Sequence, residues 1–342
     1  MVGRADLDRL LGAVDARLAA ALAPLVAALV AAVRRAGDRP GHPLPPARVP
    51  FLRQIAAEGI AALFGATPGA VFAADGAALT PVAALLATAT REASALAVAP
   101  ALGQVRGRLA GHPDLLDALT GGRALPPGGI NPRPLVDTAR SWVSPDGYRL
   151  SDRIWLAGED IRTRIDTLLD YHVGKGTTAT VVADELEQFL TAEGALDRTR
   201  RPYGRVGSLR ARTLARTETS RAYNVAAAQM AELNPFAQGI GYRLSNNHPE
   251  ADICDERASA DPDGLGPGNY RPRNYPIPPS HPNCRCYTVT IQRQSTEQVI
   301  ADLGRWARGE QVPGYEGVGT VPLEAETLVS WLTGFGPPGS GR

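Results

Sequence analysis

The sequence predicts a mainly α-helical protein. An N-terminal helical region is followed by a helical neck and by a small α+β module that cysteine and histidine stabilise. Three observations predict this fold: apolar residues recur at helical spacing over most of the chain, residues 241–245 and 286–293 alternate as strands do, and all three cysteines lie around these two segments. The 342 residues, 44% of them hydrophobic, suffice for about two packed domains and exclude wholesale disorder.

The N-terminal helical region is expected over residues 1–145. Residues 6–35 carry leucine and valine at helical spacing and end in arginines, which predicts a long helix that Pro24 could kink. The rest of the region is expected to alternate helices with Pro-rich and Gly-rich breaks: a linker at 38–50, helices at 51–64, 81–98 and around 115–119, and an extended loop at 121–134.

A membrane span is not the favoured interpretation of the apolar N-terminal residues. The run 18–33 has 16 residues and contains Pro24, whereas about 20 residues span a bilayer. Acidic residues precede this run, and a small-residue cleavage site is not evident, so a secretion signal is not predicted. A reduced cytoplasmic setting fits better.

The helical hairpin neck is expected over residues 146–207. Ser151 is predicted to cap a helix that ends at Gly174 and Gly176, and Thr177 or Thr178 is predicted to cap a second helix over 179–190. An arginine-rich turn follows.

The α+β module is expected over residues 208–295. A helix over 208–233 stops before Asn234-Pro235, and the two strands then enclose an irregular insertion rich in proline and glycine. Residues 296–342 are expected to form C-terminal helices and a loose tail, with Ser295 and Gln298 at capping-box spacing before the first helix and a second helix at 323–332.

The strongest candidate site combines the three cysteines with one histidine. His281, Cys284 and Cys286 fall within six residues, and Cys254 lies 30 residues before Cys284. Three thiolates and one imidazole are a set that tetrahedral Zn²⁺ prefers, and the prolines around His281 stiffen the loop. These four residues are therefore the predicted ligands of one structural zinc ion.

Two other interpretations of the cysteines stay open. The three thiols can be reduced and buried without metal, or Cys254 can form a disulfide with one of the other two. A second cysteine in a CxxC around Cys254 is missing, because Arg257 occupies that place. His248 and Asp252 are alternative ligands.

A basic cluster and a polar helix are the remaining candidates. Residues 196–223 contain eight arginines and only two acidic residues, whereas the whole chain has a net charge of only +1. The cluster predicts sequence-independent contact with DNA phosphates, through Arg198, Arg200, Arg201 and Arg205, or else a solvated helix face. Within ARTETSRAYN (215–224), a buried polar network is predicted to dock this helix on the cysteine loop, through Thr217, Glu218, Arg221 and Asn224.

These motifs carry a family resemblance. RTETSRAYN, followed by a cysteine and then by PPSHPNCRC and a strand, resembles the phage Mu F-like minor head proteins, which include the head-morphogenesis proteins of Bacillus siphophages. The resemblance covers roughly residues 146–295. The family usually has a CxxC before HPNCRC, and Arg257 is a departure from that pattern.

The resemblance implies a minor capsid protein of the virion rather than an enzyme. It implies association with the portal and with the scaffold or major capsid protein, a role in DNA packaging or ejection, and a location inside the capsid or at the portal vertex, with host cytoplasm during assembly. Two alternatives come from other classes: a metal-dependent nuclease that uses His281 and the cysteines, and a non-specific DNA-binding module. The nuclease needs a histidine base beyond the metal ligands, and only His248 lies nearby in sequence.

Overall fold

The computed structural model confirms the predicted fold class, which is mainly helical with one small antiparallel sheet. The structure describes residues 4–37, 41–115, 147–191, 209–234, 236–245, 248, 251–292, 295–307 and 310. The chain forms two compact units, here called the helical unit (residues 11–89 and 140–216) and the sheet unit (residues 1–10, 90–139 and 217–342). The boundaries between the units fall inside α1 (Arg4–Ala36), α3 (Pro81–Leu109) and α8 (Leu209–Leu233).

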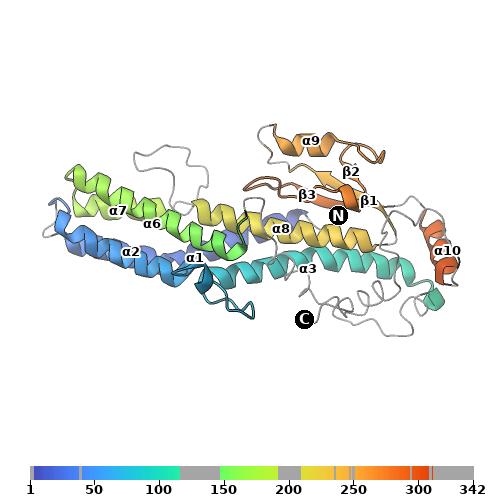
Figure 1. Ribbon diagram of the computed structural model, residues 1–342, viewed down its shortest axis with the longest axis horizontal. Helices are drawn as coiled ribbons and strands as arrows, with labels where there is room; N and C mark the ends of the chain where they lie inside the picture. The colour runs from blue at the N-terminus through green and yellow to red at the C-terminus, as the bar shows by residue number, and fades with distance from the viewer. Residues whose placement is uncertain are drawn as a thin grey trace. The chain divides into compact units, whose positions relative to one another are not determined.

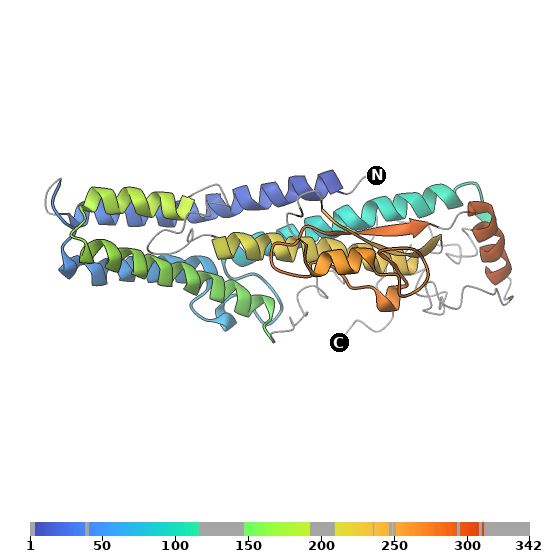
Figure 2. The ribbon, with the colours of Figure 1, turned by 90° about the horizontal axis from the view of Figure 1, so that it is seen from above.

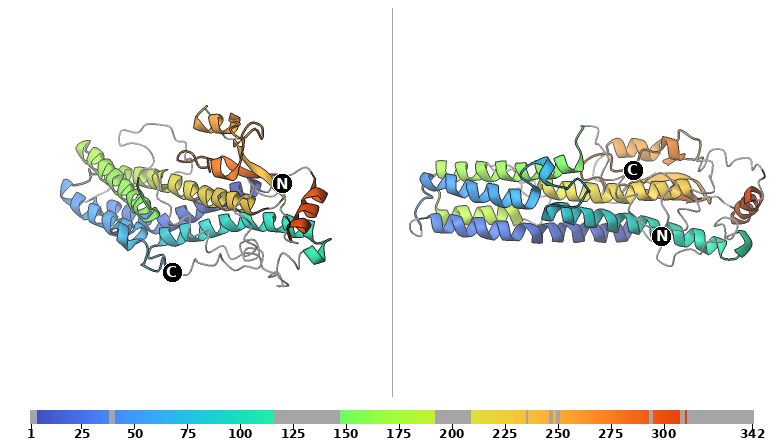
Figure 3. Two further views of the ribbon diagram at one scale, coloured as in Figure 1. Left: turned by 45° about the vertical axis from the view of Figure 1, so that its right-hand side comes forward. Right: turned by 60° about the horizontal axis from the view of Figure 1, so that its bottom comes forward.

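Antiparallel helices make up the helical unit. Its part of α1 runs beside α2 (Val49–Phe64), α6 (Leu150–Gly174) and α7 (Ala179–Thr191) (Figures 2 and 3). The helices α2 and α6 approach closely because Gly158 has no side chain: a Cβ there would lie 2.7 Å from Cβ of Phe64. The core consists of fully buried aliphatic and aromatic side chains, among them Leu18, Leu29, Leu52, Phe64, Ile154 and Phe189.

The sheet unit is built on the second half of α8. Its antiparallel sheet has the order β2-β1-β3, with β1 (Ala237–Arg243) in the centre, β2 (Asn269–Tyr270) and β3 (Tyr287–Gln292). Figure 1 shows the sheet between α8 and the short helix α9 (Ile253–Ser259). The helix α10 (Thr296–Ala307) follows β3, and Ser295 accepts a hydrogen bond from the Gln298 amide, as its predicted capping position requires.

Some predicted boundaries are wrong. Ser151 is not the cap: the N-cap of α6 is Arg149, two residues earlier, and the Asp152 carboxylate accepts a hydrogen bond from the Arg149 amide. Part of the predicted linker 38–50 belongs to α2, because proline fits the first turn of a helix. The third helix continues eleven residues beyond the predicted end at Val98 and passes through Pro100. The helices predicted near 115–119 and at 323–332 lie wholly or mostly outside the described residues.

Two described helices, α1 and α3, are long and apolar enough to cross a membrane. About half of each apolar window is buried inside the structure, at 44% and 50%. Core helices of soluble proteins meet the same criterion, so the two helices are weak evidence for a membrane.

Candidate metal centre

The fold brings the three cysteines of the sheet unit together. Cys254 lies in the first turn of α9, whereas Cys284 and Cys286 lie in the loop that leads into β3. All three are buried and free, and their sulfur atoms lie within 4.8 Å of one another. Tetrahedral zinc with Zn–S bonds of about 2.3 Å places its sulfurs about 3.8 Å apart. The Sγ–Sγ distance from Cys254 to Cys284 is 3.7 Å, so this cluster could hold a metal ion.

Local backbone structure positions Cys254 and Cys284. The Asp252 side chain caps α9 and accepts a hydrogen bond of 2.6 Å from the Cys254 amide. In the loop that leads into β3, a hydrogen bond from the Cys284 amide to the His281 carbonyl closes a turn. Asn283 has a φ of +63°, which asparagine adopts more readily than most residues do. The capped helix and the tight turn fix where the thiols point.

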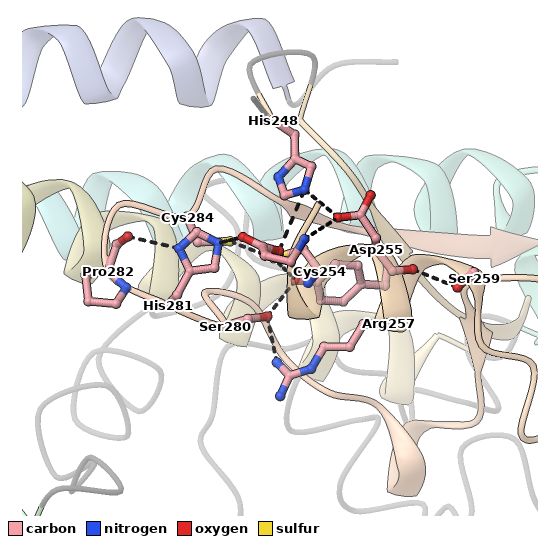
Figure 4. Close-up of polar contacts among 11 residues, drawn as sticks. His248, Cys254, Asp255, Arg257, Ser259, Ser280, His281, Pro282 and Cys284 are labelled. Atoms are coloured by element: carbon pink, nitrogen blue, oxygen red, sulfur yellow. Dashed lines mark hydrogen bonds and ion pairs between the residues drawn. The ribbon is translucent and has the colours of Figure 1, made fainter. Parts of the chain in front are cut away.

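His281 lies beside the cysteines but faces a carboxylate. Its Nε2 is 3.1 Å from Oδ2 of Asp252, and its Nδ1 is 3.0 Å from the Pro282 carbonyl oxygen (Figure 4). The ligand atoms of His281, Asp252 and Cys254 form a second group within 4.8 Å. Of the four predicted ligands, the three cysteines therefore form one group. His281 lies within 4.8 Å of one of them, Cys254.

A hydrogen-bonded layer lies next to the sulfurs. The Tyr242 hydroxyl is 3.1 Å from the Cys254 sulfur and 2.6 Å from Oγ of Ser280. Arg257 donates a hydrogen bond of 2.6 Å to the same Ser280 oxygen (Figure 4). The arginine at the place of a second CxxC cysteine thus contacts the cluster through Ser280. Sequence reasoning missed Tyr242 and Ser280, although Tyr242 occupies an alternating position of a predicted strand.

The three thiols differ in acidity. The hydrogen bond from the Cys286 side chain, with further backbone hydrogen bonds, lowers the pKa of Cys284 to about 5 against the opposing effect of burial. Burial raises the pKa of Cys254 to about 11, and the adjoining Cys284 thiolate together with burial raises the pKa of Cys286. Of the three thiols, Cys284 is therefore the one that ionises most readily.

The polar residues of α8 hold the cysteine loop against the helix. Oγ1 of Thr217 accepts a hydrogen bond of 2.9 Å from the Asn283 amide. The Asn224 side chain donates to the Cys286 carbonyl at 3.3 Å and accepts from the Thr288 amide at 2.8 Å. Glu218 is buried and lies 3.5 Å from Nε of Arg221. Thr217 and Asn224 thus contact the loop directly, and Glu218 forms an ion pair with Arg221.

The arginine cluster divides into two parts. The four residues predicted to contact DNA, Arg198, Arg200, Arg201 and Arg205, lie outside the described residues. The described arginines serve the fold: Arg216 pairs with Asp15, Arg212 is buried, and Arg210 lies 3.9 Å from Asp160. Contact of the first four arginines with DNA phosphates therefore stays a prediction.

In comparisons with known proteins, no family model, no curated protein and no solved structure matches this chain. The site therefore defines only a class, that of a helical protein with a small sheet unit and a buried three-cysteine cluster suited to a metal ion.

Proposed function

We propose that this chain is a minor capsid protein of a phage or prophage that acts at the portal during head assembly and DNA packaging or ejection. One observation carries the proposal. The two motifs that resemble the Mu F-like minor head proteins are about 60 residues apart in sequence, and they contact each other through Thr217–Asn283 and Asn224–Cys286. A chance resemblance of two separate segments would not require such contacts.

The proposed partners are the portal protein and the scaffold or major capsid protein. Double-stranded DNA is a further proposed partner, bound through phosphates by Arg198, Arg200, Arg201 and Arg205 without regard to sequence. We assign the sheet unit a structural role, in which the metal centre holds the cysteine loop in the position where it contacts α8.

We expect the chain to co-purify with the portal protein encoded in the same phage or prophage genome. Both proteins are co-expressed, the portal carries an affinity tag, and the eluate is analysed by mass spectrometry. Purified particles from the same genome are expected to contain a few copies of the chain. Its absence from both the portal eluate and the particles would contradict the proposed function.

We propose Zn²⁺ as the metal, held by Cys254, Cys284 and Cys286 with His281 as the fourth ligand. The donor set fits, because the three sulfurs lie within 4.8 Å of one another and a ring nitrogen of His281 lies within 4.8 Å of the Cys254 sulfur. The Pro282 carbonyl accepts from Nδ1, which leaves Nε2 as the coordinating nitrogen. Bound zinc would act structurally, since it replaces apolar core that the loop lacks.

Zinc affinity should rise with pH. Zinc binds thiolates, and Cys254 and Cys286 must each lose a proton because their pKa values are raised, whereas Cys284 is already ionised above a pKa of about 5. Between about pH 6 and 8, two released protons give an increase of up to roughly 100-fold per pH unit. Competition with a chromophoric chelator measures this slope. An affinity independent of pH would contradict coordination by these thiols.

The nuclease alternative gains support from one contact. The structure places His248 2.8 Å from Asp255, next to the metal centre, so a histidine beyond the proposed zinc ligands is present. Metal-dependent cutting of plasmid DNA that His248→Ala abolishes without loss of fold would place this alternative above the capsid role.

A further inference from the structure

Three polar side chains form a chain of hydrogen bonds that ends at the Cys254 sulfur. Arg257 donates to Oγ of Ser280 at 2.6 Å, and this oxygen lies 2.6 Å from the Tyr242 hydroxyl. The Tyr242 hydroxyl in turn donates to Sγ of Cys254 at 3.1 Å. Figure 4 shows the guanidinium of Arg257 turned toward Ser280. A cation is thus connected to a candidate metal ligand through two hydroxyl groups.

The donors of this chain all point toward the sulfur. A guanidinium has only N–H donors, so the Ser280 oxygen accepts from Arg257. Because the single proton of the Tyr242 hydroxyl is used in the bond to Cys254, the Ser280 hydroxyl donates to Tyr242. Hydrogen bonds aligned in this way polarise one another, so a chain that starts at a cation and ends at sulfur favours negative charge on that sulfur.

A metal-bound cysteine cluster needs such compensation. Three thiolates and a neutral imidazole around Zn²⁺ leave one negative charge in excess, and the three cysteines are at most 3% exposed. A buried net charge is costly unless a group of opposite sign offsets it. Asp252 adds a further negative charge beside His281, and His248 is already paired with a carboxylate. Within the part of the chain that the structure describes, Arg257 pairs with no carboxylate, so its positive charge is available to the cluster.

We infer that Arg257 is a positioning residue of the metal centre, which acts through Ser280 and Tyr242 to stabilise the thiolate of Cys254. The inference rests on the zinc binding proposed above. It assigns a role to the arginine that stands in the place of the second cysteine of a CxxC. Instead of a fourth sulfur, this position supplies the positive charge that offsets the excess negative charge of the other three.

The zinc affinity of the full chain, measured by competition with a chromophoric chelator, tests this role. Arg257→Gln removes the charge and should weaken Zn²⁺ binding about tenfold, the lower end of the range for groups that hydrogen-bond to metal ligands. Arg257→Lys should restore most of the affinity, because an ammonium group keeps both the charge and an N–H donor for Ser280. An arginine that only packs against its neighbours would not be rescued in this way.

Tyr242→Phe tests the connection, because it removes the hydroxyl and leaves Arg257 in place. It should weaken Zn²⁺ binding by a similar factor, and Arg257→Gln added to it should cost little more, since both substitutions interrupt the same chain. Arg285→Gln is the matched control. Arg285 lies between Cys284 and Cys286 and is also half-buried, yet it makes no hydrogen bond with any described residue. Its substitution should change the affinity less than about threefold.

Three results would overturn the inference. Equal effects of Arg257→Gln and Arg285→Gln would show that the cluster responds only to the net charge of the chain. Unchanged affinity in Arg257→Gln, or in Tyr242→Phe should the first variant fail to fold, would overturn the role of Arg257 alone. Wild-type protein that binds no Zn²⁺ would overturn the zinc proposal and this inference with it. Circular dichroism of each variant separates a loss of affinity from a loss of fold.

Discussion

Cys284→Ser should unfold the sheet around the metal centre while the helical unit stays folded. Structural zinc supplies about 10–16 kcal/mol of apparent binding free energy at neutral pH, and a module that depends on it unfolds when a ligand is lost. We expect the variant to lose one zinc equivalent and the amides of β1 and β3 to lose hydrogen-exchange protection. The amides of α2 and α6 should keep their protection, because those helices have a separate apolar core.

The composition of the core explains this dependence. The described buried cluster around the sheet contains three cysteines, three tyrosines, two alanines and one isoleucine: Cys254, Cys284, Cys286, Tyr242, Tyr270, Tyr275, Ala228, Ala231 and Ile240. The three tyrosines each need a hydrogen-bond partner when buried. Little aliphatic area remains to offset the conformational entropy of the long loop between β1 and β3.

Chelation provides the control for the serine variant. If zinc stabilises the module, chelator treatment of the wild type should reproduce the effect of Cys284→Ser, and the two changes together should cost little more than either alone. If the cysteines are instead reduced core thiols, chelator will have no effect and the substitution will cost only about 1–2 kcal/mol. That result would contradict the metal centre.

Periodicity predicted the long described helices and the two longer strands, although the first strand was predicted at 241–245 and lies at 237–243. The grouping of the cysteines was predicted from their chemistry instead: His281, Cys284 and Cys286 fall within six residues, and Cys254 completes a set of ligands that zinc prefers. The elements that were missed, α9 and β2, have seven and two residues. Segments this short carry too few residues to show a period, and their conformation depends on tertiary contacts.

One signal for α9 was present in the sequence. Asp252 and Asp255 stand at N-cap and N3 spacing, which is a capping-box pattern with aspartate at the second position. The pairing of His248 with Asp255 depends on where this helix begins, so it could not be predicted while the segment was treated as irregular. The cap predicted at Ser151 is wrong because Asp152, at N3, accepts a hydrogen bond from the Arg149 amide, and the helix therefore begins at Leu150.

Asn224→Ala tests the contact between the two motifs and should destabilise the sheet unit. The side chain is fully buried, donates to the Cys286 carbonyl, and accepts from both the amide and the hydroxyl of Thr288. Alanine leaves these buried groups without their partner, at about 1–3 kcal/mol for each unsatisfied group, so we expect a loss of about 3 kcal/mol in the free energy of unfolding. Denaturant titration measures it.

Asn274→Ala is the matched control, because it removes the same side chain from an exposed position where Asn274 makes a hydrogen bond to Asp263. That variant should lose less than about 1 kcal/mol. A readout specific to docking is hydrogen exchange at the Thr288 amide, whose acceptor is Asn224, and which should exchange faster only in Asn224→Ala. Equal effects of the two variants, with Thr288 exchange unchanged, would mean that α8 and the cysteine loop are held together by apolar packing. The contact of Asn224 with the cysteine loop would then no longer support the proposed capsid function.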